Sequence, residues 1–186
     1  MNPTANKSDF EDLTTNLKDL AYSYLEKYNP SKQQLKVYLL KKYLTKIKGT
    51  KSKKEVTSII DEIILNLEKN RILNDEMYSD SKARMFLRRG YSLNKINQSL
   101  RNKGIEDKFI KQSLDKIKED EIEPDFVSAL KLCKRRRIGP LRPGPNRELF
   151  YKKDMGILAR GGFSFDLSKR ILDLDSEEFK KLIKII

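Results

Sequence analysis

The chain has 186 residues, of which 40 are Lys or Arg and 27 are Asp or Glu, so its formal net charge is +13. With one cysteine and no histidine, the sequence excludes an internal disulfide bond, a zinc site built from Cys and His ligands, and a Cys–His catalytic pair. It has no run of about 20 apolar residues to span a membrane and no apolar signal segment at residues 1–6. We therefore expect a cytoplasmic protein, in keeping with the single thiol.

Three capping boxes predict helix starts in the N-terminal part of the chain. Each pairs a serine with a Glu or Gln three residues later: Ser8 with Glu11, Ser31 with Gln34, and Ser52 with Glu55. Residues 1–7 are predicted to be frayed, and residues 46–54 to form a Lys-rich connection between the second and third helices. The third helix is rich in β-branched residues, which favour strands. The 3–4 spacing of its apolar positions from Val56 to Leu67 predicts a helix instead.

The stretch from Asn74 to Leu114 predicts three short helices with capping signals at their ends. Asn74 can cap the first helix, and Gly90 ends it. Ser92 can cap the second helix, which ends at Gly104. The third helix carries apolar residues at 3–4 spacing, namely Phe109, Ile110, Leu114 and Ile117.

A further helix is predicted from Pro124, because proline suits a first helical turn. Cys133 falls on the apolar face of this helix and is predicted to be a core residue. Residues 138–146 hold two glycines and three prolines and are predicted to be irregular. Further helices are predicted at residues 147–160, at residues 167–172 behind a cap at Ser164, and at residues 176–186.

Equivalent residues recur at constant separations along the chain. Ser31 and Ser92 begin matching patterns 61 residues apart. Five pairs of positions, one of them Gly104 and Gly162, share an offset of 58. Amphipathic helices also resemble one another by coincidence, but a shared offset that includes a glycine favours a true repeat. We predict an all-α fold, an elongated array of three tandem three-helix repeats that resemble helix-turn-helix units. The predicted repeats are residues 8–73, including the Lys-rich insertion 46–54, residues 74–120 and residues 121–175, followed by a short C-terminal helix at 176–186.

The basic residues are concentrated in blocks, one in each predicted repeat. Residues 31–60, 74–104 and 124–147 carry net charges of +8, +4 and +6. Scattered lysines only raise solubility, whereas recurring blocks favour a surface that binds a polyanion or an acidic protein. Cations near helix C-termini also serve as caps, but four in a row exceed what a cap needs. The predicted contact residues are Arg84, Arg88, Arg89, Lys103, Lys134, Arg135, Arg136 and Arg137.

The sequence shows no catalytic constellation. Histidine is absent, paired acids such as Asp75 and Glu76 stand at helix starts, and no phosphate-binding loop with Walker spacing is present. We expect a protein that is not an enzyme and that needs no cofactor or metal.

Residues 73–105, LNDEMYSDSKARMFLRRGYSLNKINQSLRNKGI, resemble the central repeat of the RecX family, regulators of the RecA recombinase. The resemblance rests on Asn-Asp-Glu at the start, an Arg-Arg-Gly helix end, a serine cap and a closing Lys-Gly-Ile. The segments RRRIGP (135–140) and ILARGGFSFDLSKRILDL (157–174) are similar to the last repeat of the alphaproteobacterial branch. The likeness covers residues 10–175, and before residue 73 it lies in the pattern only, with an enlarged Lys-rich insertion.

The resemblance implies a regulator in DNA repair, homologous recombination and the SOS response. RecX proteins are thought to bind the groove of the RecA–DNA filament and to lower its ATPase, strand-exchange and coprotease activities, with weaker direct DNA binding and no catalytic site. We expect a monomer with no membrane contact. The alternative is a stand-alone DNA-binding protein acting without RecA, whose helix at residues 92–103 would present Asn94, Asn97, Gln98 and Asn102 to base edges.

Overall fold

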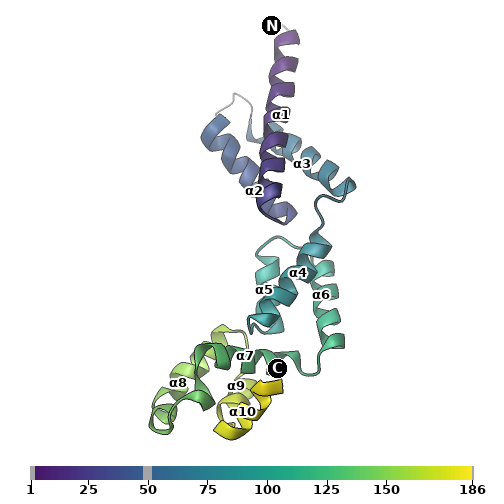
Figure 1. The fold of residues 1–186 in the computed structure, drawn as a ribbon. Helices are drawn as coiled ribbons and strands as arrows, with labels where there is room; N and C mark the ends of the chain where they lie inside the picture. Colours follow the sequence, from purple (N-terminus) through teal and green to yellow (C-terminus); the bar gives the residue numbers. More distant parts are fainter. Residues whose placement is uncertain (1–2, 48–51, 186) are drawn as a thin grey trace. The chain divides into compact units, whose positions relative to one another are not determined.

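The computed structural model describes residues 3–47 and 52–185. Most of these residues are helical and none of them forms a strand, which confirms the all-α prediction (Figure 1). A π-helix, η1 (Tyr43–Ile47), and a 3₁₀-helix, η2 (Gly139–Leu141), accompany the α-helices. The α-helices are α1 (Pro3–Lys27), α2 (Lys32–Lys42), α3 (Lys53–Lys69), α4 (Asp75–Arg88), α5 (Leu93–Arg101), α6 (Asp107–Asp120), α7 (Pro124–Arg136), α8 (Gly144–Arg160), α9 (Phe165–Leu172) and α10 (Ser176–Ile185). None of these described helices is long and apolar enough to cross a bilayer.

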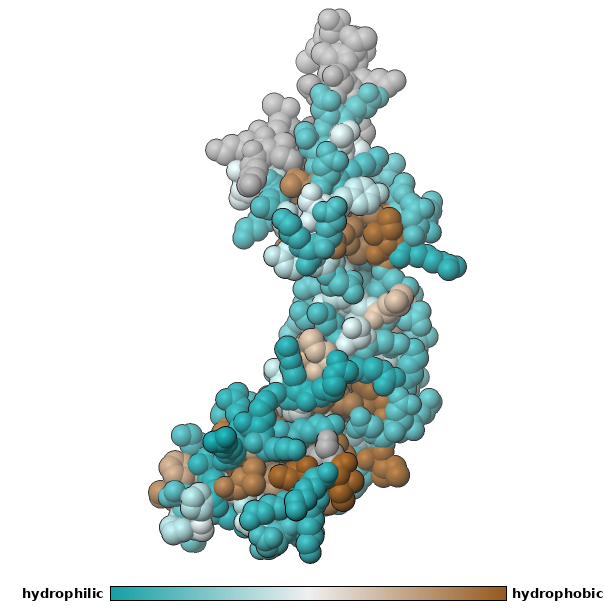
Figure 2. All heavy atoms as spheres, in the orientation of Figure 1, coloured by the Kyte–Doolittle hydropathy of each residue, from teal (hydrophilic) through white to brown (hydrophobic). Residues whose placement is uncertain are grey.

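The backbone contacts divide the chain into two compact units. The first contains Met1–Tyr78 and Lys103–Ile105, and the second contains Ser79–Asn102 and Glu106–Ile186. The helix α4 therefore contributes its first residues to one unit and the rest to the other. On the face drawn in Figure 2, hydrophilic side chains cover most of the surface of each unit.

Two of the predicted capping boxes are confirmed. The Ser31 hydroxyl accepts a hydrogen bond from the Gln34 N–H at 3.2 Å, and Gln34 Oε1 accepts one from the Ser31 N–H at 3.1 Å. Ser52 and Glu55 make the same reciprocal pair at the start of α3. At the N-terminus, α1 begins at Pro3, so that residues 3–7, predicted to be frayed, are helical, and the helix start predicted at Ser8 is wrong. Proline suits a first helical turn, and no helix-breaking residue lies between it and the apolar stripe of α1.

The core of the first unit lies between α1, α2 and α3. The segment rich in β-branched residues forms the helix α3, as predicted. Its buried apolar residues repeat every three or four positions, and they are Val56, Ile59, Ile60, Ile63, Ile64 and Leu67. The expected Lys-rich connection is shortened at both ends because α2 continues into η1 and α3 begins at Lys53. Residues 48–51 of that prediction lie outside the described residues.

The N-terminal end of α2 holds the start of α4 and the segment Lys103–Ile105 by hydrogen bonds within the first unit. The Ser31 hydroxyl donates to the Lys103 carbonyl at 2.7 Å, and the Lys32 N–H donates to Asp75 Oδ1 at 3.0 Å. These bonds satisfy backbone groups at both ends of the contact. The predicted caps at Asn74 and Gly90 are also present, since Asn74 Oδ1 accepts from the Met77 N–H and Gly90 has a φ of 71°.

The N-terminal end of α5 makes a corresponding set of contacts within the second unit. The Ser92 N–H donates to the Gly161 carbonyl at 3.2 Å, and the Leu93 N–H donates to Asp125 Oδ1 at 2.7 Å. The residue after Gly161 must also be glycine. Gly162 has a φ of +87°, and a Cβ there would lie 2.4 Å from Ser92 Oγ. The N-terminal ends of α2 and α5 therefore bind the same two kinds of acceptor, an aspartate carboxylate and the carbonyl before a glycine with positive φ.

A polar cluster joins α4 to α6 in the second unit. Asp80 Oδ1 accepts a hydrogen bond from the Ser113 hydroxyl at 2.6 Å, and Asp80 Oδ2 pairs with Lys116 Nζ at 2.6 Å. Burial tends to raise the pKa of Asp80. The hydrogen bonds from Lys116 and Ser113 outweigh this effect, and the pKa of Asp80 lies below its ordinary value.

We expect Asp80→Asn to lower the free energy of unfolding by about 1 kcal/mol at pH 7. Because the folded-state pKa of Asp80 is lowered, its stabilisation is fully present above the unfolded-state value of about 3.9 and is lost as pH falls through the folded value. Urea unfolding at pH 7 and pH 3 should therefore show the difference between variant and parent shrinking in acid. Asp115→Asn, in an exposed pair on α6, serves as the control, and an undiminished difference at pH 3 would contradict this explanation.

An apolar core lies between the helices α7 to α10, and Cys133 is buried in it as predicted. Burial raises the pKa of the Cys133 thiol to about 12, with a smaller contribution from the Asp154 carboxylate. Asp154 is 1% exposed and fixes the turn between α7 and α8. It accepts hydrogen bonds from the Gly139 N–H at 2.9 Å and from Arg142 Nε and Nη2 at 2.6 and 2.7 Å.

Candidate functional site

The last turn of α7 carries the densest group of predicted contact residues. Lys134, Arg135 and Arg136 occupy that turn, and Arg137 follows as the C-cap in the left-handed conformation, with a φ of 54°. All four side chains are exposed. Lys134 Nζ donates to the Ile183 carbonyl near the end of α10 at 3.2 Å, so this side chain is tied to its own unit.

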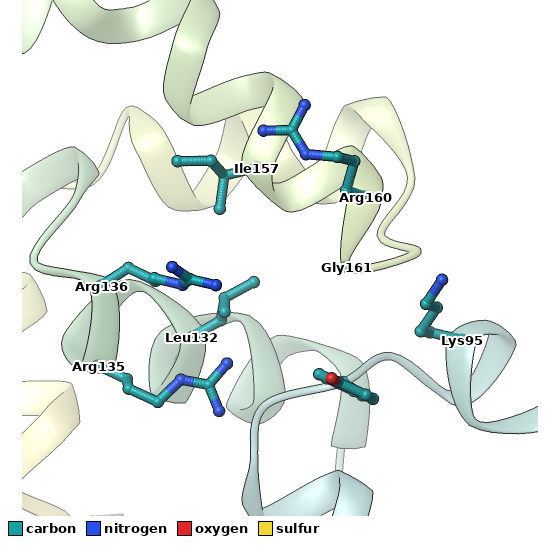
Figure 3. A pocket seen from close by; sticks show the side chains of 8 residues that line it. Lys95, Leu132, Arg135, Arg136, Ile157, Arg160 and Gly161 are labelled. Atoms are coloured by element: carbon teal, nitrogen blue, oxygen red, sulfur yellow. The ribbon is translucent and has the colours of Figure 1, made fainter. Parts of the chain in front are cut away.

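Arg135 and Arg136 line a cavity of about 430 Å³ between the start of α5 and the C-terminal ends of α7 and α8. We call it the α5–α7–α8 cavity. Figure 3 shows that its cationic side chains come from three helices, with Lys95 on α5 and Arg160 on α8. Its remaining lining residues are Tyr91, Leu132, Ile157 and Gly161. The cavity thus brings Arg135 and Arg136 of the predicted contact residues together with Lys95 and Arg160, which were not predicted.

The Asp154–Arg142 pair, which fixes the turn between α7 and α8, and the close approach of Gly90 to α7 position the walls of this cavity. Gly90, with a φ of +71°, lets the end of α4 approach α7 closely, since a Cβ there would lie 2.8 Å from the Leu132 nitrogen. The Ser92 N–H, bonded to the Gly161 carbonyl, fixes the start of α5 against the end of α8. Backbone contacts at Gly90 and Gly161 therefore position the walls together with the Asp154–Arg142 pair.

The four cations of the cavity have no carboxylate partner among the described residues. Within that part of the chain, the side chains of Lys95, Arg135, Arg136 and Arg160 make no ion pair and no hydrogen bond with another residue. Charges of one sign in a cleft with low-dielectric walls concentrate the field there. The cavity is a place where an anion would relieve the repulsion between these side chains.

The other predicted contact residues lie elsewhere. Arg84 pairs with Asp120 at 2.9 Å on the surface between α4 and α6, and such exposed pairs contribute little stability. Arg88 and Arg89 are exposed at the end of α4. Lys103 belongs to the first unit, where its carbonyl accepts the Ser31 hydroxyl.

Sequence reasoning missed Lys95 and Arg160 as members of the cationic cluster. Arg160 looked like an ordinary cation in the last turn of a helix. Lys95 carried a signal, because a cation in the first turn of α5, which has no acidic residue there, opposes the helix dipole and gives no cap. Its proximity to α7 and α8 depends on the contact between Ser92 and Gly161, which no local pattern reveals.

Comparison with known proteins identifies the family. The chain is 32% identical over 161 residues to the regulatory protein RecX of Myxococcus xanthus strain DK1622, and the alignment covers 86% of this chain and 85% of that relative. This chain belongs to the RecX family. The RecX proteins of Corynebacterium efficiens and Agrobacterium fabrum are 30% and 26% identical over 131 and 113 residues, which are 61% and 58% of those relatives. No family model and no solved structure matches the chain.

The family resemblance seen in residues 73–105 is thus confirmed over most of the chain. The relatives are named regulatory proteins. The α5–α7–α8 cavity lies in a chain of the same family.

Proposed function

We propose that this RecX-family chain regulates the RecA recombinase by binding the RecA–DNA filament and lowering its ATPase, strand-exchange and coprotease activities. Its likeness to a regulatory RecX protein over 86% of the chain carries the proposal. The protein acts by binding alone, as a monomer without a cofactor. The basic blocks support this role because the filament contains a polyanion, and acidic or phosphate surfaces attract such blocks over distance.

Exposed arginines are the proposed contacts with the filament. Arg88 and Arg89 stand at the end of α4, and Arg135, Arg136 and Arg137 stand at the end of α7. A guanidinium group can hold a carboxylate or a phosphate in a two-pronged hydrogen bond, which gives both attraction and orientation. Three further cations, Arg84, Lys103 and Lys134, complete the proposed set.

The test is DNA-stimulated ATP hydrolysis by the cognate RecA at physiological salt while this protein is titrated in. The proposal expects inhibition at well below one molecule per RecA protomer, because a filament stops growing when few of its subunits are blocked. Inhibition that is absent, or that begins only when the protein is abundant enough to coat the DNA, would reject regulation through the filament.

A stand-alone DNA-binding role is the second candidate, and the side chains of α5 favour it. Asn94 and Gln98 are exposed on this helix, and Asn97 is half-buried. Such amides can read base edges. This role predicts binding to DNA without RecA that weakens steeply as salt rises, because phosphate contacts release counterions.

A further inference from the structure

We infer that the α5–α7–α8 cavity binds one nucleoside phosphate unit, with its phosphate against the four cations and its base against the apolar wall. The ligand is either a free nucleotide or one nucleotide of a single-stranded nucleic acid, since the two share this chemistry. The inference uses Arg135 and Arg136, which are also proposed filament contacts. It concerns the isolated protein and is tested without RecA.

The cationic side of the cavity offers more donors than one carboxylate can accept. Arg135, Arg136 and Arg160 each carry five N–H donors in a planar fork, and Lys95 adds an ammonium group. A carboxylate has two oxygens and one charge, whereas a phosphate group presents up to three terminal oxygens to donors from several sides. Donors from three helices (Figure 3) suit the tetrahedral anion better than the flat one.

The apolar side of the cavity would make no favourable contact with an inorganic anion. Leu132 is only 4% exposed and Ile157 is half-buried, and both line the same space as the cations. Tyr91 also lines it, and its ring stacks on Phe86 with centroids 5.4 Å apart and planes 10° from parallel. An aromatic ring held in this way is a rigid platform, and bases bind such platforms without much dependence on sequence.

The size of the cavity fits one nucleotide unit. Pockets for small molecules and cofactors have volumes of about 300–1,000 Å³, and this one measures about 430 Å³. A duplex keeps its bases paired and stacked, so that it cannot place a base against Leu132 and Ile157 without opening. The combination of cations and apolar wall therefore selects unpaired nucleotides.

The test measures binding to the full-length protein without RecA. The probes are ADP with a fluorescent label on the ribose, a labelled five-residue oligothymidylate, and unlabelled pyrophosphate as competitor. We expect at least one labelled probe to bind, and ADP to compete at least about tenfold more effectively than pyrophosphate, because the base adds contacts that pyrophosphate lacks. Binding of ADP alone assigns a free nucleotide, and tighter binding of the oligothymidylate assigns a single strand; either result supports the inference.

Variants locate the binding in the cavity. Lys95→Gln and Arg160→Gln should each weaken binding about tenfold, since each removes one charge-assisted contact. Lys152→Gln, which removes an exposed cation of α8 outside the cavity and outside the proposed contact set, is the matched control and should leave binding within about twofold. Unchanged helical circular dichroism will show that each variant is folded.

Three results would overturn the inference. These are that neither probe binds at millimolar concentration, that pyrophosphate competes as well as ADP, or that Lys152→Gln weakens binding as much as Lys95→Gln does. If RecA inhibition persists in any of these cases, nucleotide binding in the cavity is rejected while the proposed function stands. If the probes bind as expected but RecA is not inhibited, the proposed function fails while the cavity stands.

Discussion

Replacing Arg135 and Arg136 together by glutamate is expected to abolish inhibition of the RecA ATPase at concentrations where the parent protein inhibits fully. The change turns two exposed cations at the end of α7 into anions without touching the core. Opposing like charges across an interface costs several kcal/mol, so the concentration for half-inhibition should rise by about 100-fold or more. The measurement is the same ATPase titration at fixed salt.

Two controls separate the site from the overall charge. Lys152→Glu with Lys181→Glu makes the same change in net charge on exposed residues of α8 and α10, and we expect it to shift half-inhibition by less than about fivefold because such charges act only through screened, long-range steering. Arg135→Gln with Arg136→Gln avoids placing anions at a helix C-terminus and should give an intermediate loss. Equal losses in the two glutamate variants would show that net charge, and not this cluster, governs the inhibition.

The Asp154→Ala variant should lose about 3 kcal/mol of unfolding free energy, the largest effect on stability that we expect from a single polar substitution. Asp154 is 1% exposed, and its carboxylate accepts three hydrogen bonds from Gly139 and Arg142. Removing one partner of a buried pair leaves the other charge and a backbone N–H without their acceptor. Urea unfolding followed by circular dichroism measures the loss.

The matched control for Asp154→Ala is Asp173→Ala. Asp173 is exposed and accepts one hydrogen bond, from the Tyr151 hydroxyl at 2.9 Å, so its removal should cost no more than about 1 kcal/mol. A comparable loss in both variants would mean that the Arg142 pair contributes no more than a surface contact. Because Asp154 fixes the turn that leads from α7 into α8, its loss should also weaken nucleotide binding in the cavity.

The local features of this fold were predictable from the sequence because each depends on residues within one turn. Ser92 caps α5 by accepting the Lys95 N–H, and the glycines at 90 and 104 adopt positive φ values, as their positions after helix ends indicated. The apolar spacing identified α3 as a helix against its β-branched composition. In each case neighbouring residues alone determine the energetics.

Contacts between distant segments were not predictable in the same way. Arg142 and Asp154 lay in a segment predicted to be irregular and in the helix after it, and nothing local indicated that they form a buried pair. Arg84 pairs with Asp120, 36 positions away, and no local pattern indicated that pair. The cavity itself joins residues of three helices, and its formation depends on tertiary packing that a single sequence does not display.

The burial of Cys133 gives this protein a built-in reporter of its own opening. It is the one cysteine in the sequence, and with its thiol buried and its pKa raised to about 12, almost no reactive thiolate meets the solvent in the folded second unit. A thiol reagent can modify it only in molecules whose α7–α10 core has opened. The labelling rate therefore follows the opening equilibrium of that unit. A ligand of the cavity would slow the labelling in proportion to its occupancy, without any dye or tag on the protein.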